Sequence, residues 1–98
     1  MLAELTQKVS AIVEKKAAVG FNIKFDLGDD GIILVQGEEA PNRVTNEDGA
    51  AATTIIMSAE NFAAMMSGEL SSMNAFMSGK LRIEGSMEKA MQLGSLFS

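Results

Sequence analysis

The sequence predicts one small domain that mixes helices and strands. Apolar residues recur every three or four positions at the start of the chain, alternate with polar residues between positions 21 and 27, and return to helical spacing after residue 58. Ninety-eight residues form a single domain whose core is near the lower limit for independent folding. No internal repeat or low-complexity linker divides the chain.

The first predicted element is an amphipathic helix that begins near residue 2 and ends near Gly20. Its apolar positions follow helical spacing and are Leu2, Leu5, Val9, Ile12 and Val13. A helix that lies on a membrane surface needs a strongly basic polar face, and here Glu4 and Glu14 dilute the lysines. We therefore interpret it as a helix that packs on the sheet of its own domain.

Four strands follow in the pattern. In residues 21–27 apolar side chains alternate with polar ones, and residues 28–31 form a hairpin turn of glycine and aspartate. Residues 32–35 are apolar on both faces, as in a covered or central strand. After Pro41, residues 43–45 can form only a short edge strand, and residues 53–57 are β-branched. Sequence order alone arranges these four strands as a simple meander.

The C-terminal half contains three short helices and one strand. Ser58 is a helix cap and Gly68 ends that helix, and a second short helix carries Met73 and Phe76. In residues 80–84 charged and apolar side chains alternate, as in a half-buried strand. Ser86 then caps a final helix that extends toward residue 97.

Composition excludes most catalytic chemistry. The chain has no Cys, His, Trp or Tyr, so it lacks thiolate nucleophiles, imidazole bases and zinc sites of the His–Cys type. The loop that begins at Asp26 superficially resembles a calcium loop, but Gly28 and Gly37 occupy two required ligand positions. We predict no enzymatic activity, no cofactor and no metal site.

Charge argues against nucleic-acid binding. Thirteen acidic and eight basic residues give a net charge of −5, whereas phosphate backbones are bound through clustered Lys and Arg. No apolar run has the length of a membrane span, and no signal-peptide core follows Met1. The default expectation is a cytoplasmic protein without stable membrane insertion, which leaves room for transient membrane contact.

Methionine is concentrated in the C-terminal half, where seven of the eight residues follow position 56. Methionine is flexible and polarisable, and proteins use it both to fill small cores and to line adaptable apolar surfaces. Periodicity leaves both interpretations open. The candidate wall residues of a ligand cavity are Phe62, Met65, Met66, Phe76, Met77, Met87, Met91 and Leu93.

Three segments of this half resemble sterol carrier protein domains of the type 2 class. The first comprises residues 53–62 (TTIIMSAENF) with residues 66–70 (MSGEL), and the second and most diagnostic comprises residues 75–87 (AFMSGKLRIEGSM). Residues 90–97 (AMQLGSLF) continue in register. Glu69 and Ser72 depart from the family pattern, which usually has Lys and often Pro there. The short chain without a peroxisomal tail looks like a bacterial stand-alone member.

The resemblance implies an α+β fold. A five-stranded, mainly antiparallel sheet would be covered on one face by helices, with the fourth strand beside the first and an apolar tunnel between the layers. It also implies non-catalytic binding and transfer of a long-chain lipid or sterol-like small molecule: a fatty acid, an acyl-CoA, a sterol or a phospholipid.

A second hypothesis is a protein-interaction module with a closed core that serves as an accessory to a lipid-metabolising enzyme. The two hypotheses differ in cavity content, because a carrier needs a cavity of roughly 300 Å³ or more. The sequence does not determine the oligomeric state.

Overall fold

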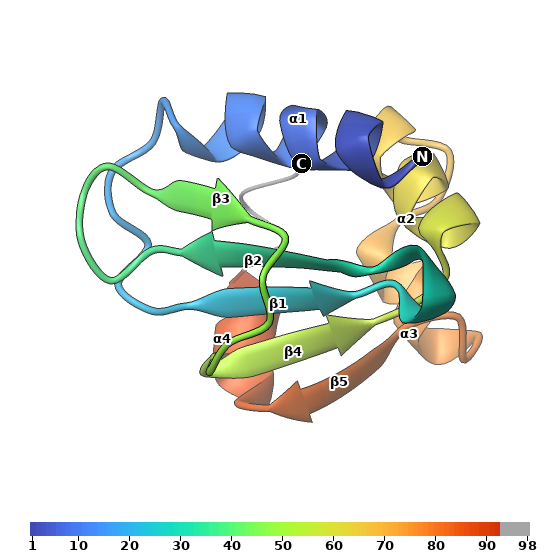
Figure 1. The fold of residues 1–98 in the computed structure, drawn as a ribbon. Helices are drawn as coiled ribbons and strands as arrows, with labels where there is room; N and C mark the ends of the chain where they lie inside the picture. The colour runs from blue at the N-terminus through green and yellow to red at the C-terminus, as the bar shows by residue number, and fades with distance from the viewer. Residues whose placement is uncertain (93–98) are drawn as a thin grey trace.

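The computed structural model describes residues 1–92 of the chain, which form four α-helices and one five-stranded sheet (Figure 1). The elements in chain order are α1 (Leu2–Val13), β1 (Ile23–Asp26), a short 3₁₀ turn (Gly28–Asp30), β2 (Ile32–Gln36), β3 (Arg43–Thr45), β4 (Thr53–Ile56), α2 (Ala59–Ser67), α3 (Ser72–Met77), β5 (Arg82–Gly85) and α4 (Met87–Gln92). The predicted α+β class is confirmed, and the final helix is described as far as Gln92.

The strand order of the sheet is β3-β2-β1-β4-β5. The hairpin between β1 and β2 is antiparallel, and so are the β2–β3 and β4–β5 pairs. The central pair is different, because β1 and β4 run parallel, with Ile23 opposite Thr53 and Phe25 opposite Ile55. The meander that sequence order suggested is therefore wrong at the fourth strand. The placement implied by the family resemblance is confirmed.

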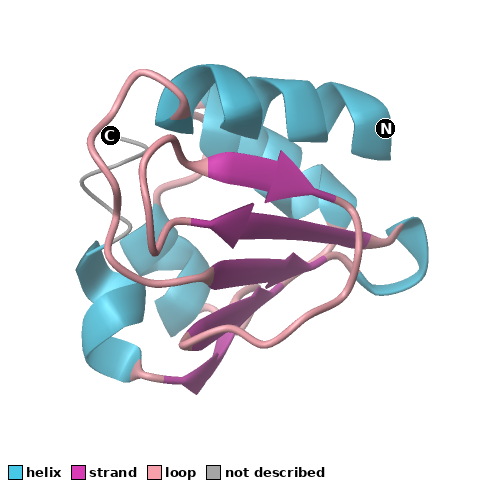
Figure 2. Ribbon diagram, turned by 60° about the vertical axis from the view of Figure 1, so that its left-hand side comes forward, coloured by secondary structure: helices cyan, strands magenta, loops and turns pink. Residues whose placement is uncertain are grey.

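All four helices pack against one face of the sheet (Figures 1 and 2). The core lies in this layer, where alternate residues of the strands meet apolar residues of the helices. The buried core residues from the helices are Leu5, Val9, Val13, Ala59, Phe62, Ala75 and Ala90. The buried core residues from β1, β2 and β4 are Ile23, Phe25, Ile33, Val35 and Ile55. This layer is the part of the fold in which a ligand site can form.

A loop covers part of the opposite face. The segment between β3 and β4 crosses in front of the sheet in Figure 1, and a Cβ added at Gly49 would lie 3.1 Å from a methyl group of Leu34. Leu34 is buried there although it belongs to the face away from the helices. The Lys24 ammonium pairs with Asp48 of the same loop, and this contact holds the pKa of the Asp48 carboxyl below its ordinary value. The sequence predicted a strand that is central or covered by helices; in the structure β2 lies between β3 and β1, with helices on one face and this loop on the other.

The first helix ends at Val13, seven residues before the predicted stop at Gly20. The buried amide of Asn42 accounts for the difference. Its Nδ2 donates to the carbonyl oxygens of Val13 (2.9 Å) and Ala17 (3.1 Å), and its Oδ1 accepts from the Val19 N–H (3.2 Å). These bonds satisfy the carbonyl groups at the helix exit, so the chain leaves the helix early without orphaned backbone groups.

Each of the three short helices is capped at its N-terminus by a serine hydroxyl. Ser58, Ser71 and Ser86 each accept a hydrogen bond from the backbone N–H three residues later, at 3.1, 3.1 and 3.2 Å. The capping roles predicted for Ser58 and Ser86 are confirmed, and the cap of α3 is Ser71. The caps fix where α2, α3 and α4 start over the sheet.

Candidate ligand-binding pocket

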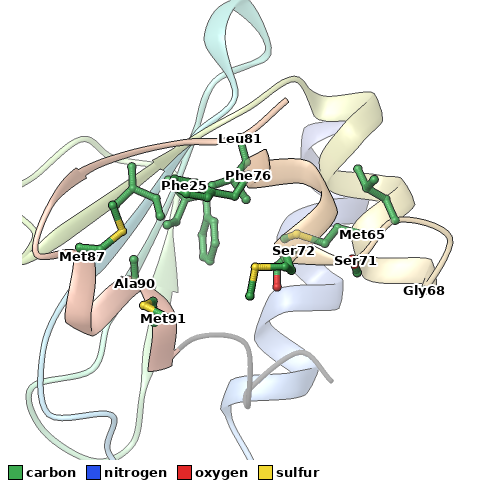
Figure 3. A pocket seen from close by; sticks show the side chains of 14 residues that line it. Phe25, Met65, Gly68, Ser71, Ser72, Phe76, Leu81, Met87, Ala90 and Met91 are labelled. Carbon is green, nitrogen blue, oxygen red and sulfur yellow. The ribbon is translucent and has the colours of Figure 1, made fainter. Parts of the chain in front are cut away.

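An apolar cavity of about 440 Å³ lies between the sheet and the C-terminal helices (Figure 3). Its floor comes from three neighbouring strands: Phe25 on β1, Ile55 on β4, and Ile83 on β5 with Leu81 just before it. Phe25, Ile55 and Leu81 are buried, because their side chains also belong to the core. The register of β1, β4 and β5 therefore brings segments that are far apart in the chain to one apolar surface.

One wall of the cavity is formed by α4 and the facing part of α3. Met87, Ala90 and Met91 line it from α4, at positions i, i+3 and i+4 of one helical face. Met73 and Phe76 line it from α3. In Figure 3 the α4 side chains lie on one side of the cavity, with Phe25 and Phe76 between them and Met65.

The other wall comes from the end of α2, the linker to α3 and the first residue of α3. Met65, Gly68, Leu70, Ser71 and Ser72 line it. The serines give this end hydroxyl groups, whereas the α4 wall offers methyl, methylene and thioether groups. The cavity is therefore apolar along most of its length and has a polar end at the linker.

The mouth of the cavity exposes large apolar side chains. Met73 is 60% exposed, Met91 67%, Met87 46% and Phe76 43%. Exposed apolar surface gathered at one opening marks a site for a ligand or partner. The resemblance implied a tunnel, and what the structure contains is a cavity with this apolar mouth.

The structure brings together four of the eight candidate wall residues, Met65, Phe76, Met87 and Met91. Three others lie outside the cavity lining, namely Phe62, Met66 and Met77. Leu93 lies outside the described residues.

Packing explains why three candidates do not line the cavity. Phe62 is fully buried beneath the sheet residue Phe25, with ring centroids 5.0 Å apart, so it is a core residue. Met66 packs against the same core from α2. Met77 is 77% exposed and lies next to Phe76, whose side chain α3 directs to the cavity. A spacing of three or four residues marks a broad helical face and does not separate such neighbours.

Sequence reasoning missed the floor of the cavity and its polar end. The alternation of Leu81 and Ile83 was the available signal for the floor, but it does not distinguish a ligand-facing residue from a core residue. Ser71 and Ser72 carried no signal beyond their position before a helix. Met73 shared the helical spacing of Phe76 and could have been included.

The lining suits an apolar ligand and provides no catalytic group. None of the described residues that line the cavity is ionisable. Within residues 1–92 no cluster of acidic side chains could hold a metal ion. No helix in that part of the chain has both the length and the apolar character of a membrane span. The arrangement can hold a ligand by burying its apolar surface.

An open five-stranded sheet with helices on one face and an apolar cavity between the layers defines a small α+β binding domain. Residues 2–98 match the model of the SCP-2 sterol transfer family, and the chain belongs to this family. Membership places it among domains that bind and transfer sterols and other lipids and are generally non-catalytic.

Two curated proteins share sequence with the chain. Peroxisomal multifunctional enzyme A of Dictyostelium discoideum is 34% identical over 99 residues, which cover 96% of this chain and 20% of that protein. Human sterol carrier protein 2 is 43% identical over 51 residues, which cover 52% of this chain and 9% of that protein. The chain thus spans a fifth or less of the length of these relatives.

Solved structures share the fold. Sterol carrier protein 2 from Yarrowia lipolytica in its apo form aligns with a TM-score of 0.69 and 20% identity, covering 97% of this chain and 77% of that one. The sterol carrier protein domain 2 of Helicoverpa armigera has a TM-score of 0.68 and 25% identity, covering 97% and 80%. The palmitated SCP2L2 of Aedes aegypti has a TM-score of 0.68 and 15% identity, covering 98% and 89%.

Proposed function

We propose that the protein carries one long-chain apolar ligand in the cavity between the sheet and the helices, without chemical turnover. The observation that carries this proposal is the cavity itself, about 440 Å³ in volume and lined by apolar side chains from β1, β4, β5 and three helices. Its volume falls within the usual range of small-molecule sites, roughly 300–1,000 Å³. Family membership supports a sterol or another lipid as the ligand class.

Uptake and release need a way into the cavity. The exposed methionines at the mouth provide it, because methionine side chains change rotamer at low cost and adapt to ligands of different shape. We infer that a ligand enters between α3 and α4 and lies over Phe25.

Titration of the protein with a fluorescent sterol and a fluorescent fatty acid tests the carrier function. A matched pair of variants locates the site, since Met87 lines the cavity and Met77 does not, although both are exposed. Met87→Glu places a charge at the mouth and should weaken binding by at least about tenfold, whereas Met77→Glu should leave it unchanged. A folded protein that binds neither probe saturably would exclude the carrier function.

A second candidate function rests on one comparison. The likeness to one fifth of a peroxisomal multifunctional enzyme favours a domain that serves a lipid-metabolising enzyme. The two functions are compatible if the enzyme receives the bound lipid. They separate if the folded protein binds no lipid, in which case the apolar mouth would be a surface for protein contact.

A further inference from the structure

Thioether side chains are concentrated at the mouth of the cavity. Four of the described residues that line it are methionines, and three of these, Met73, Met87 and Met91, are exposed. Met87 and Met91 share one face of α4 (Figure 3), and Met73 lies on the facing part of α3. The fourth, Met65, is half-buried and packs against the core. The three exposed side chains therefore meet both the solvent and a ligand that occupies the cavity.

Methionine is also the most readily oxidised residue type in this chain. Peroxides attack cysteine thiolates and methionine thioethers, and the chain contains no cysteine. It also lacks Trp, Tyr and His, which stronger oxidants attack. A peroxide that reaches the protein therefore reacts at methionine, and the exposed methionines react first.

We propose that Met73, Met87 and Met91 form a modification site, at which oxidation by a peroxide lowers the affinity of the cavity for its apolar ligand. Methionine sulfoxide reductases convert the sulfoxide back to the thioether, so the change is reversible. This inference rests on the proposed carrier function, because ligand affinity is the property that oxidation changes.

The reaction needs only the thioether and the peroxide. A lone pair of the sulfur attacks one peroxide oxygen, and an S–O bond forms as the O–O bond breaks. The second oxygen takes up the proton of the first and leaves as water. The sulfur loses two electrons, the peroxide gains them, and the product is methionine sulfoxide, which is polar where the thioether is apolar.

The loss of affinity follows from the surroundings of the three side chains. While the cavity is empty, water satisfies the sulfoxide oxygen, which is a hydrogen-bond acceptor. The other described side chains of this wall, Phe76 and Ala90, cannot donate a hydrogen bond. A ligand that covers the wall therefore removes water from the sulfoxide without replacing its hydrogen bond. This should weaken binding on the order of tenfold for each sulfoxide that the ligand covers.

Met77 is an internal reference for the oxidation itself. It is more exposed than any of the three, but it does not line the cavity. A fluorescent sterol at about ten times its Kd leaves roughly one protein molecule in ten empty, so it should slow oxidation of the three by up to about tenfold. Oxidation of Met77 by hydrogen peroxide should be unchanged, and peptide mapping by mass spectrometry measures all four rates. Equal rates with and without bound sterol at the three positions would overturn the inference, because the ligand would not cover them.

Sterol titration before and after peroxide treatment measures the effect on affinity. Oxidised protein that remains folded by circular dichroism should bind the sterol at least about tenfold more weakly, and treatment with methionine sulfoxide reductases should restore the Kd. Unchanged affinity after mass spectrometry shows complete conversion of Met73, Met87 and Met91 overturns the inference and leaves the carrier function standing. Absence of sterol binding by the untreated protein removes both together.

Two leucine variants assign the effect to these three residues. Leucine keeps the apolar volume of methionine but has no sulfur to oxidise. In the triple variant Met73→Leu, Met87→Leu and Met91→Leu, peroxide should leave the Kd within about twofold of its untreated value. The control Met77→Leu keeps the three thioethers, so it should lose affinity as the unsubstituted protein does. An equal loss in the triple variant would assign the effect to other methionines and overturn the proposed site.

Discussion

Replacement of Phe76 by Ala separates the ligand surface of α3 from its solvent surface. Phe76 lines the cavity and is 43% exposed. For a phenylalanine surface of about 200 Å², roughly 90 Å² is available for a ligand to cover. At about 25 cal/mol per Å² this area contributes about 2 kcal/mol to binding, so Phe76→Ala should raise the Kd roughly 30-fold.

The next residue provides the matched control. Met77 is on the same helix, is 77% exposed and does not line the cavity, so Met77→Ala should leave the Kd within about twofold. Both side chains are large, apolar and exposed. A general loss of surface hydrophobicity would therefore weaken binding in both variants, whereas a cavity-specific contact weakens it in one.

Stability sets the conditions of the assay. The buried part of Phe76 is about 110 Å², and its loss costs about 3 kcal/mol of unfolding free energy. This corresponds to a Tm lower by roughly 12–24 °C for a domain of this size. Fluorescent sterol titrations are therefore run near 10 °C, with circular dichroism to verify folding. An unchanged Kd in folded Phe76→Ala, or an equal loss in Met77→Ala, would refute the assignment of this wall.

Three further predictions address ligand linkage and the scaffold. Ligand at about 100 times its Kd should stabilise the protein by about 2.7 kcal/mol, raise the Tm by roughly 10–20 °C and slow amide exchange in residues 87–92; equal melting and exchange with and without ligand would contradict it. Asn42→Ala should cost about 2–3 kcal/mol in chemical denaturation, because the buried Val13 carbonyl at the end of α1 and the Ala17 carbonyl beyond it lose their donor. A loss below about 1 kcal/mol would assign the early helix end to another cause. Gly85→Ala should be poorly folded, since its φ is +87° and the new Cβ would lie 2.6 Å from the Ala52 carbonyl oxygen. Gly79→Ala, with φ +80° and no neighbour within 4 Å, should cost only about 1 kcal/mol by the same measurement.

Local elements could be predicted because their causes are local. Ser58 and Ser86 cap helices at the points where the spacing of apolar residues changes from strand to helix. The turn at residues 28–31 closes the first hairpin. The pairing of β1 with β4 depends on contacts 30 residues apart in the chain, such as Ile23 with Thr53. Periodicity contains no information on such a partner, and the family resemblance supplied it. The early end of α1 was missed for the same reason, because the side chain that bonds the Val13 carbonyl there is Asn42, which lies 29 residues away in the chain.

Composition predicted that the C-terminal half has an adaptable apolar surface, but the sequence did not identify which residues line the cavity. The methionines after position 56 indicated an adaptable apolar surface, and Met65, Met87 and Met91 lie on it. Phe62 and Met77 satisfy the same helical spacing, but one lies in the core and the other in solvent. Which side of a short helix faces a cavity depends on how the helix is rotated over the sheet, and that rotation is set by tertiary packing.

The parallel pairing of β1 with β4 also determines when the sheet can be completed during synthesis. Until residues 53–56 emerge from the ribosome, one edge of β1 has no partner, and apolar Ile23 and Phe25 lie along it. An open apolar edge of this kind pairs readily with other chains. The N-terminal hairpin alone is therefore an aggregation hazard. Nascent chains that stall before β4 should need a chaperone, whereas chains that stall after it should already be closed at the centre of the sheet.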